Sequence, residues 1–305
     1  MGTVLYREPQ LERPDLIASW PGIGNIGIIA VDSLRVQLRA EELGEIEPWD
    51  FFYPKKVIIR GGVLEVLEFP GNKFYYKRLA NRDVLFFVGE EQPAAGGQMY
   101  AEGGKAYQMA GLVLDVAQKF GCRRVYTSGA AVALTHHTMK PRVWAVTSSK
   151  ALASEIKGFG NTVLMGEAEG RGGSGSITGL NGLLLGLAKK RGLEATCLMG
   201  EIPDYLSGAP FPYPTASKSV LEVFAALLGA ELDYTVLGDM ASQVDEIVNG
   251  IYDKLPPEIK ERLEQRKAAM QAAKSEEITD EDQRWLKEHI DELFKKGGRG
   301  GERPT

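Results

Sequence analysis

The chain has 305 residues, a formal net charge of −5 and 44% hydrophobic residues, an ordinary composition for a globular protein. Acidic and basic residues are mixed along it, so it lacks the concentrated basic face of general nucleic-acid binders. Its two cysteines, Cys122 and Cys197, indicate a reducing compartment and no disulfide framework. No apolar run approaches the roughly 20 residues of a membrane span, and the first ten residues do not resemble a signal peptide. We therefore expect a cytoplasmic protein that binds neither membranes nor nucleic acid.

Short β-branched or aromatic runs alternate with amphipathic stretches along residues 1–238. This alternation, with glycine or proline at the junctions, predicts a parallel or mixed sheet with helices on both faces. The expected strands are 15–20, 56–60, 63–69, 73–77, 83–88, 123–127, 142–147, 162–165 and 195–200. The expected helices are 25–40, 99–120, 149–157, 179–191 and 216–229. Within this series the segment 57–77 predicts antiparallel hairpins that would add a mixed edge to the sheet.

The first expected strand runs into a glycine-rich bend with the sequence PGIGNIG at 21–27. A strand, a glycine turn and a helix in this order form an anion site when free N–H groups and the helix dipole face the turn. Gly22, Gly24 and Gly27 also fit the G-x-G-x-x-G pattern of dinucleotide-binding folds. Such folds need an acidic residue at the end of a second strand, and the segment 41–44 is expected not to form a strand. The preferred interpretation is therefore close packing of chain segments or a small anion site.

Several polar side chains follow the ends of expected strands, where parallel sheets bind their ligands. The candidate ligand-binding crevice comprises Gly22, Gly24, Asn25, Gly27, Glu90, Glu91, Gln92, Ser128, His136, His137, Arg171 and Glu201. If these residues converged, a histidine or glutamate would supply a base and Arg171 an anion clamp, as hydrolases and phosphorylases require. No catalytic residue is assigned, because the sequence has no G-x-S-x-G nucleophile elbow.

Two other kinds of chemistry are not expected. The second glycine-rich loop, 170–176, lacks the lysine that a Walker A motif needs, which argues against P-loop ATP hydrolysis. The adjacent residues His136 and His137 point in different directions on an extended chain, and no third ligand has diagnostic spacing. We therefore expect no metal site and no cofactor.

The composition changes near residue 239. Residues 239–305 hold 28 charged residues in 67 positions, against 49 in the first 238. We therefore predict an α/β domain over 1–238 and a charged helical extension over 239–305, with a flexible end. Apolar residues at helical spacing predict one helix ending before Pro256 and two more at 257–273 and 280–296. The last helix has an apolar face that either covers its own domain or contacts a sister subunit, formed by Trp285, Leu286, Ile290, Leu293 and Phe294.

Several segments, taken in order, resemble the PAC2 family of archaeal and bacterial proteins related to proteasome assembly chaperones. They are PGIGNIG at 21–27, GEEQP at 89–93, the His-Thr of 137–138, TGLNGLLLGLAKKRG at 178–192, GEIPDY at 200–205 and the helix 216–228 before Leu237. The resemblance implies a three-layer α/β/α sandwich with a phosphorylase- or hydrolase-like mixed sheet, here followed by the C-terminal helical extension. It also implies self-assembly and action by binding, in some relatives as chaperones for proteasome α-type subunits.

Archaeal relatives that engage proteasomes can end in a hydrophobic residue, a tyrosine and any third residue. This chain ends Glu302-Arg303-Pro304-Thr305, so docking through the extreme C-terminus is not expected. The resulting hypothesis is a non-enzymatic, homo-oligomeric binding protein, similar to an assembly chaperone, with an unidentified protein partner. One alternative is an enzyme of the phosphorylase or hydrolase type acting on a small anionic or nucleoside-like substrate. A nicotinamide-cofactor domain is a third, which the glycine pattern alone supports.

Overall fold

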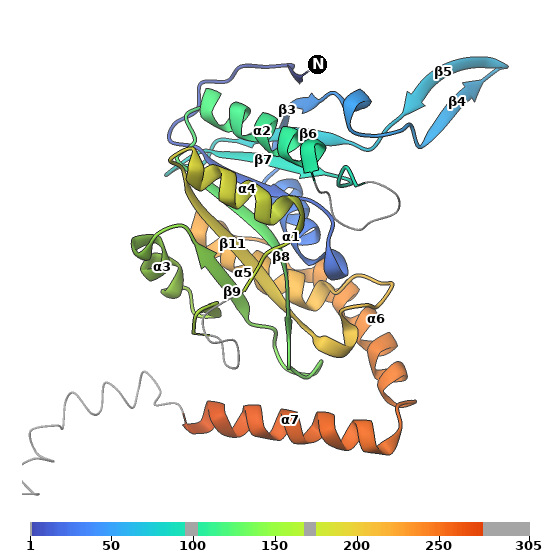
Figure 1. Cartoon of the computed structure of the whole chain (residues 1–305), viewed down its shortest axis with the longest axis vertical. Coiled ribbons are helices and arrows are strands. Elements are labelled where there is room, and N and C mark those ends of the chain that lie inside the picture. The colour runs from blue at the N-terminus through green and yellow to red at the C-terminus, as the bar shows by residue number, and fades with distance from the viewer. Residues whose placement is uncertain (1, 95–102, 168–174, 277–305) are drawn as a thin grey trace, which may run out of the picture. The chain divides into compact units, whose positions relative to one another are not determined.

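The computed structural model describes residues 2–94, 103–167 and 175–276. The chain divides into two compact units, Met1–Lys254 and Leu255–Thr305. The first unit holds the predicted α/β domain (Figure 1). The described part of the second unit contains one helix, α7 (Pro257–Glu276), which begins where the sequence predicts. No helix in the described ranges is long and apolar enough to cross a membrane.

The first unit is built on a mixed sheet of nine strands in the order β1-β3-β6-β7-β2-β8-β11-β9-β10. Its four central strands are parallel: β7 (Val84–Gly89), β2 (Asp15–Ser19), β8 (Arg124–Ala133) and β11 (Glu194–Pro203). One side is extended by three antiparallel strands, β6 (Asn72–Lys77), β3 (Glu41–Ile46) and β1 (Thr3–Leu5). The other side is extended by β9 (Val143–Thr147), antiparallel to β11, and by β10 (Thr162–Leu164), parallel to β9.

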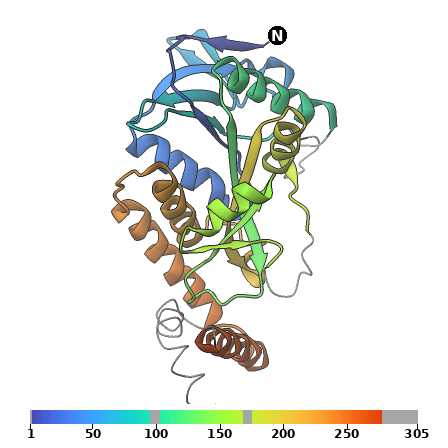
Figure 2. The ribbon, with the colours of Figure 1, turned by 90° about the vertical axis from the view of Figure 1, so that its left-hand side faces the viewer.

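Helices cover both faces of this sheet (Figure 2). One layer contains α1 (Ile26–Gln37), α3 (Lys150–Lys157), α5 (Pro214–Leu228) and α6 (Thr235–Tyr252), and the other contains α2 (Gly103–Lys119) and α4 (Gly179–Lys190). Strand β2 shows how the layers arise: Ile17 packs into the first layer, while Leu16 and Ala18 pack into the second. Successive strand side chains point to opposite faces, so an apolar run buries both. The predicted three-layer α/β/α sandwich is confirmed.

Strands β1 and β3 were not among those expected, and β3 covers the segment 41–44 that was expected to lack a strand. That expectation was wrong because pairing with two neighbours outweighs the weak strand propensity of Glu-Glu-Leu-Gly. Strand β3 runs antiparallel to β1 and β6, and β6 and β7 separate it from β2. The second strand of a dinucleotide-binding half lies parallel to the first and beside it, so β3 does not restore that interpretation.

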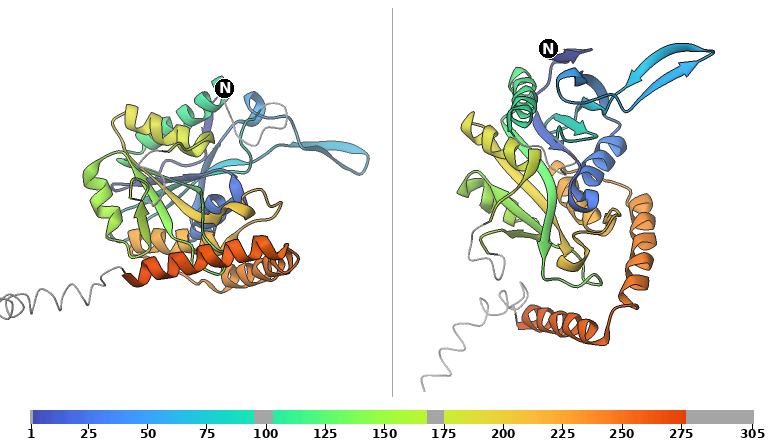
Figure 3. Two further views of the ribbon diagram at one scale, coloured as in Figure 1. Left: turned by 60° about the horizontal axis from the view of Figure 1, so that its bottom comes forward. Right: turned by 45° about the vertical axis from the view of Figure 1, so that its right-hand side comes forward.

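The segment 57–77 also departs from its expected position. Strands β4 (Lys56–Arg60) and β5 (Val63–Glu68) form the predicted antiparallel hairpin, but as a separate two-stranded sheet. This hairpin projects from the rest of the domain (Figures 1 and 3). Only β6 joins the main sheet, because β3 occupies the other edge of β6.

Helix α6 crosses the compositional boundary at 238/239. Its residues Leu237, Val244 and Val248 are buried in the same core as α1 and α5, so the first compact unit continues to Lys254. The density of charged residues therefore rises along the sequence before the end of the packed domain. This happens because α6 buries only one side and carries charged residues on the other. The predicted helix 280–296, with Trp285, Leu286, Ile290, Leu293 and Phe294, lies outside the described residues.

Candidate functional site

The glycine bend follows β2 directly and contains a short 3₁₀ turn, η1 (Ile23–Asn25), that leads into α1. Gly24 has φ +58° and Asn25 has φ 48°, in the left-handed region that glycine and asparagine adopt most readily. The Gly24 carbonyl accepts a hydrogen bond of 2.8 Å from the backbone N–H of Tyr213. A Cβ added to Gly27 would lie 2.5 Å from the carbonyl carbon of Ser128. The bend therefore brings α1 against the backbone of β8 and holds the start of α5.

Two hollows flank the bend, one on each face of the sheet. Gly22 and Ile23 line a cavity of about 190 Å³ on the α4 side, which we call the methionine cavity. Pro21 and Asn25 line a more open groove of about 660 Å³ on the α1 side, which we call the charged groove.

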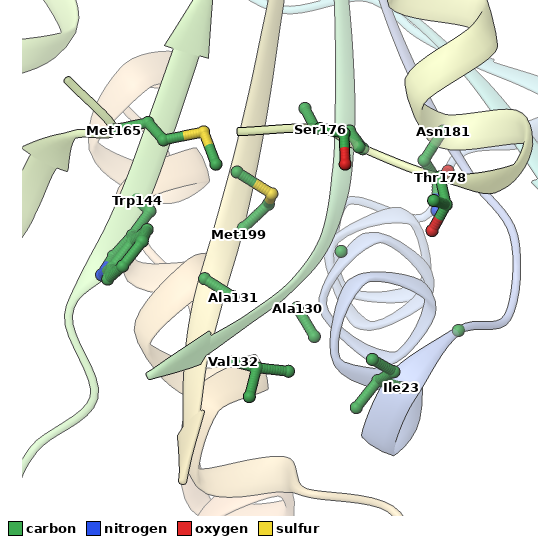
Figure 4. A pocket seen from close by; sticks show the side chains of 13 residues that line it. Ile23, Ala130, Ala131, Val132, Trp144, Met165, Ser176, Thr178, Asn181 and Met199 are labelled. Atoms are coloured by element: carbon green, nitrogen blue, oxygen red, sulfur yellow. The ribbon is translucent and has the colours of Figure 1, made fainter. Parts of the chain in front are cut away.

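The methionine cavity lies beside the C-terminal half of β8 (Figure 4). Trp144 from β9, Met165 after β10 and Met199 from β11 form one side of it. Ser176 and Thr178, just before α4, lie on the side nearer that helix, and both residues are exposed. The cavity therefore has a mixed lining, with Trp144 and the two methionines on one side and the polar side chains of Ser176, Thr178 and Asn181 on the other.

The charged groove lies at the C-terminal end of β7. Lys55 makes 3.2 Å ion pairs with both Glu90 and Glu91, while the Arg35 guanidinium lies 4.3 Å from the centre of the Tyr75 ring. The Gly71 backbone N–H and the Lys55 ammonium hold the pKa of Glu90 below its usual value, although partial burial opposes them. The groove thus brings together Asn25 and Glu90 of the predicted crevice, with cations that already have acidic or aromatic neighbours.

Gln92 connects the bend to helix α4. Its side-chain nitrogen donates a 2.7 Å hydrogen bond to the carbonyl of Pro21, and its side-chain oxygen accepts a 3.1 Å bond from the backbone N–H of Leu180. That N–H belongs to the first turn of α4, where the helix has no internal acceptor to offer. The structure uses Gln92 to join these segments.

Ser128 is fully buried, and its hydroxyl donates a 2.8 Å hydrogen bond to the carbonyl of Leu198 on the neighbouring strand. The two thiols are also buried, and burial raises the pKa of Cys197 to about 11 and that of Cys122 further. A thiol with such a pKa is protonated at neutral pH and is a poor nucleophile. These three residues have environments suited to packing.

Glu201 is 1% exposed and lies next to the methionine cavity wall. Its carboxylate accepts hydrogen bonds from the Trp144 indole N–H at 2.6 Å, the Arg142 guanidinium at 2.9 Å and the Arg142 backbone N–H at 3.0 Å. Three donors satisfy a buried charge that would otherwise be costly. Glu201 therefore orients the Trp144 ring that lines the cavity.

The two histidines lie in the loop after β8 and contact the end of α6. The Tyr205 hydroxyl accepts the backbone N–H of His137 at 2.9 Å and lies 2.8 Å from its Nδ1, while Nε2 lies 3.1 Å from the Asn249 side-chain oxygen. Each ring nitrogen of His137 therefore has a polar partner, the Tyr205 hydroxyl at Nδ1 and the Asn249 side chain at Nε2. The His136 and His137 rings lie 4.2 Å apart, and the Tyr252 ring is 4.8 Å from that of His137. The expectation that the two histidines point in different directions was wrong, because the chain turns here, with a 3.0 Å bond from the Met139 N–H to the His136 carbonyl, and is not extended.

The predicted crevice is therefore distributed over several contact groups. Asn25 and Glu90 share the charged groove and Gly22 lines the methionine cavity, while Gln92, Ser128, Glu201 and the histidines bind different partners. Arg171 lies outside the described residues. Across the described ranges, no three His, Cys, Asp or Glu side chains are grouped so that they could hold a metal ion.

The PAC2 family model matches residues 16–251, which include the strands of the central sheet except β1 and the first residue of β2. The chain belongs to the PAC2 family. Protein MJ1210 of Methanocaldococcus jannaschii is 28% identical over 241 residues, which cover 79% of this chain and 84% of that protein.

Solved PAC2-like structures agree with this assignment. PbaB of Pyrococcus furiosus, described as an archaeal proteasome activator, is 28% identical with a TM-score of 0.67, covering 82% of this chain and 97% of its own. PbaA of the same organism, described as an archaeal homolog of proteasome-assembly chaperone, is 22% identical with a TM-score of 0.60, covering 83% and 96%. The second likeness shows a common fold.

In this PAC2 chain the motif segments contact one another. GEEQP supplies Gln92 to the bend PGIGNIG, while GEIPDY supplies Glu201 to Trp144 and Tyr205 to His137. Sequence reasoning missed Trp144, Met165 and Met199, because apolar residues on or beside strands read as core. For Trp144 and Met199 the sequence offers one signal. Arg142 lies two positions from Trp144 and Glu201 two positions from Met199, and these two side chains have opposite charges.

Proposed function

We propose that this PAC2 protein is a non-enzymatic, self-associating cytoplasmic protein that binds proteasome subunits, as an assembly chaperone or activator does. The proposal is supported by PbaB, an archaeal proteasome activator that is 28% identical to this chain, and by PbaA, a homolog of proteasome-assembly chaperone with the same fold. The partner is expected to be a folded or folding polypeptide.

The observation that carries the proposal is the exposed apolar surface of the β4–β5 hairpin. Val63 and Leu64 are consecutive and are 66% and 63% exposed, and Ile59 on the other strand is 64% exposed. Because successive strand residues face opposite ways, both faces of the hairpin present apolar side chains. A two-stranded hairpin is only marginally stable in water by itself, and contiguous apolar surface marks protein interfaces. This hairpin is therefore the preferred protein-binding element.

The candidate catalytic groups support a binding role as well. The polar side-chain atoms of these groups form hydrogen bonds with backbone or side chains of their own domain, as seen for Ser128, Glu201 and His137. A nucleophile, base and anion clamp would have to share one cavity to act on one substrate. Here these three side chains contact different segments.

Binding and self-association are tested with the full chain by light scattering after gel filtration and by pull-down of purified archaeal 20S proteasome. We expect an oligomer that retains the proteasome, and we expect Ile59→Ser/Leu64→Ser to reduce at least one of these associations tenfold or more. Val236→Ser is the control, because Val236 is 72% exposed on α6, away from the hairpin. A monomer that binds no proteasome component would contradict the proposal.

The charged groove favours the alternative function, an enzyme acting on a small anionic or nucleoside-like substrate. Its position at the end of β7, beside the bend after β2, is where open α/β sheets bind ligands. A ligand that binds only the native state raises stability by RT ln(1 + [L]/Kd). A thermal-shift series with phosphate, nucleosides and nucleotides measures this directly, and a flat series would leave the alternative unsupported.

A further inference from the structure

We propose that the methionine cavity receives one aromatic side chain of a bound polypeptide, with a tyrosine as the best fit. This inference rests on the proposed protein-binding function and adds an anchor site to it. The cavity lies on the α4 side of the sheet, within the first compact unit.

The volume of the cavity selects a single ring. At about 190 Å³ it is somewhat larger than a cavity of about 150 Å³ that is known to bind benzene. It is smaller than the roughly 300–1,000 Å³ of pockets that hold drug-sized ligands, which argues against a nucleotide. Aromatic side chains inserted into such pockets are typical energetic anchors of protein interfaces.

The walls suit an aromatic group. Met165 and Met199 place two thioether side chains on the same side, and methionine sulfur makes favourable contacts with aromatic rings. Methionine also adapts its shape to a guest. The Trp144 ring beside them is fixed by its 2.6 Å hydrogen bond to Glu201, so this part of the wall is already ordered before binding.

The open side of the cavity suits a phenol more than a phenyl group. Ser176 and Thr178 lie there and are exposed, and the Thr178 side chain makes no capping hydrogen bond with α4. A tyrosine ring lying across the cavity, flat against the wall that carries the two methionines, would bury its ring carbons there and place its hydroxyl near these two hydroxyls. Tyrosine is suited to such sites because its apolar ring carries one polar end.

The first test uses the full chain labelled with ¹³C at the methionine methyl groups, and p-cresol as the probe for a tyrosine side chain. We expect saturable, ring-current shifts of the Met165 and Met199 signals, and no shift of Met109, which is buried in the α2 layer. Toluene should bind several-fold more weakly than p-cresol, and Thr178→Val should narrow that difference. If the Met165 and Met199 signals do not move with p-cresol, the proposal is overturned.

Cavity filling supplies the second test. Ala131→Leu adds carbon atoms at a lining residue and should abolish the p-cresol shifts, whereas Ala153→Leu on α3, outside the lining, should retain them. An unchanged Met109 signal shows that each variant is folded.

Measuring proteasome binding by the same variants separates this inference from the proposed function. If Ala131→Leu weakens proteasome binding tenfold or more while Ala153→Leu does not, the inference is supported. If the proteasome binds the Ala131→Leu variant as tightly as the wild type, the cavity is no anchor and this inference alone fails. If p-cresol binds but the wild-type chain binds no proteasome component, both the polypeptide occupant and the proposed function are overturned.

Discussion

Strand β2 and the hairpin strand β5 have similar apolar side chains and opposite environments. All five residues of β2 are buried, whereas five of the six residues of β5 are exposed and the sixth is half-buried. Strand β2 lies between β7 and β8, with helices on both faces, while β5 has only β4 beside it. Apolar composition thus stabilises the fold in one place and leaves an exposed apolar surface in the other.

The comparison separates two uses of the hydrophobic effect. In the central sheet, removal of apolar area from water occurs on folding, at about 25 cal/mol per Å². In the hairpin, the same gain is available only when a partner covers it. Mutations in the central sheet should therefore lower the unfolding free energy, whereas mutations in the hairpin should weaken association with a partner.

The largest effect is expected from Gly27→Val, which tests whether the core tolerates added volume. The new Cβ would lie 2.5 Å from the Ser128 carbonyl carbon, so α1 must move away from β8. We expect a loss of about 3 kcal/mol or more in the free energy of unfolding, or failure to fold, by urea denaturation. Gly186→Ala in α4 is the control: a Cβ there meets nothing within 4 Å, and the variant should gain about 0.5–1 kcal/mol.

The direct test of the comparison is a matched pair of leucine truncations. Leu16→Ala in β2, fully buried, should cost about 2–5 kcal/mol of unfolding free energy. Leu64→Ala in β5, 63% exposed, should cost less than about 0.5 kcal/mol but weaken association with the partner. Equal losses of stability in the two variants would contradict the contrast between core and hairpin.

A smaller loss of unfolding free energy is expected from Glu201→Gln, which tests the buried hydrogen bonds that Glu201 makes with Arg142 and Trp144. The variant keeps the shape but removes the charge that faces Arg142, whose side chain is 27% exposed. We expect a loss of about 2 kcal/mol, below the full cost of breaking a buried pair because solvent reaches the guanidinium. Urea denaturation gives the stability. A shifted Trp144 emission would show that the cavity wall depends on this carboxylate, and unchanged emission would show that it does not.

The smallest effect concerns Glu90, at the exposed margin of the domain. Its pKa is lowered from 4.5, so its stabilising contribution is complete above the unfolded-state value and is lost as the pH falls through the folded-state pKa. A ¹³C titration of the Glu90 carboxyl should show a midpoint below 4.5. In the Glu90→Gln variant, the unfolding free energy should depend slightly less on pH in the acid range. A Glu90 titration midpoint above the ordinary value would contradict the assigned contacts.

Local pattern predicted most of the fold correctly. The expected strands at 15–20, 83–88 and 195–200 correspond to β2, β7 and β11, because short apolar runs bounded by proline, glycine or charged residues have few other solutions. The expected helix 25–40 contains α1, and the family resemblance is confirmed by the match over 16–251. The weakly apolar segment 41–44 was misjudged because its strand exists only through pairing with β1 and β6.

The candidate site was less accessible to sequence reasoning. Contacts such as Gln92 with Pro21, 71 positions apart, and Gln92 with Leu180, 88 positions apart, follow from the path of the chain and have no local pattern. The same holds for the bond between Glu201 and Trp144, because the rule of strand ends selected Glu201 for the crevice and did not select Trp144. Side-chain direction decides whether a polar residue lines a cavity or joins two segments.

By itself, the sequence determined the alternation of strands and helices, the tight bend at 21–27 and the family, since these follow from periodicity and short-range steric limits. Only the tertiary structure decided that the hairpin β4–β5 stands apart, that Trp144, Met165 and Met199 enclose a cavity, and that Glu201 is held by Arg142. These features depend on which distant segments become neighbours, and burial and hydrogen bonding act on neighbours in space.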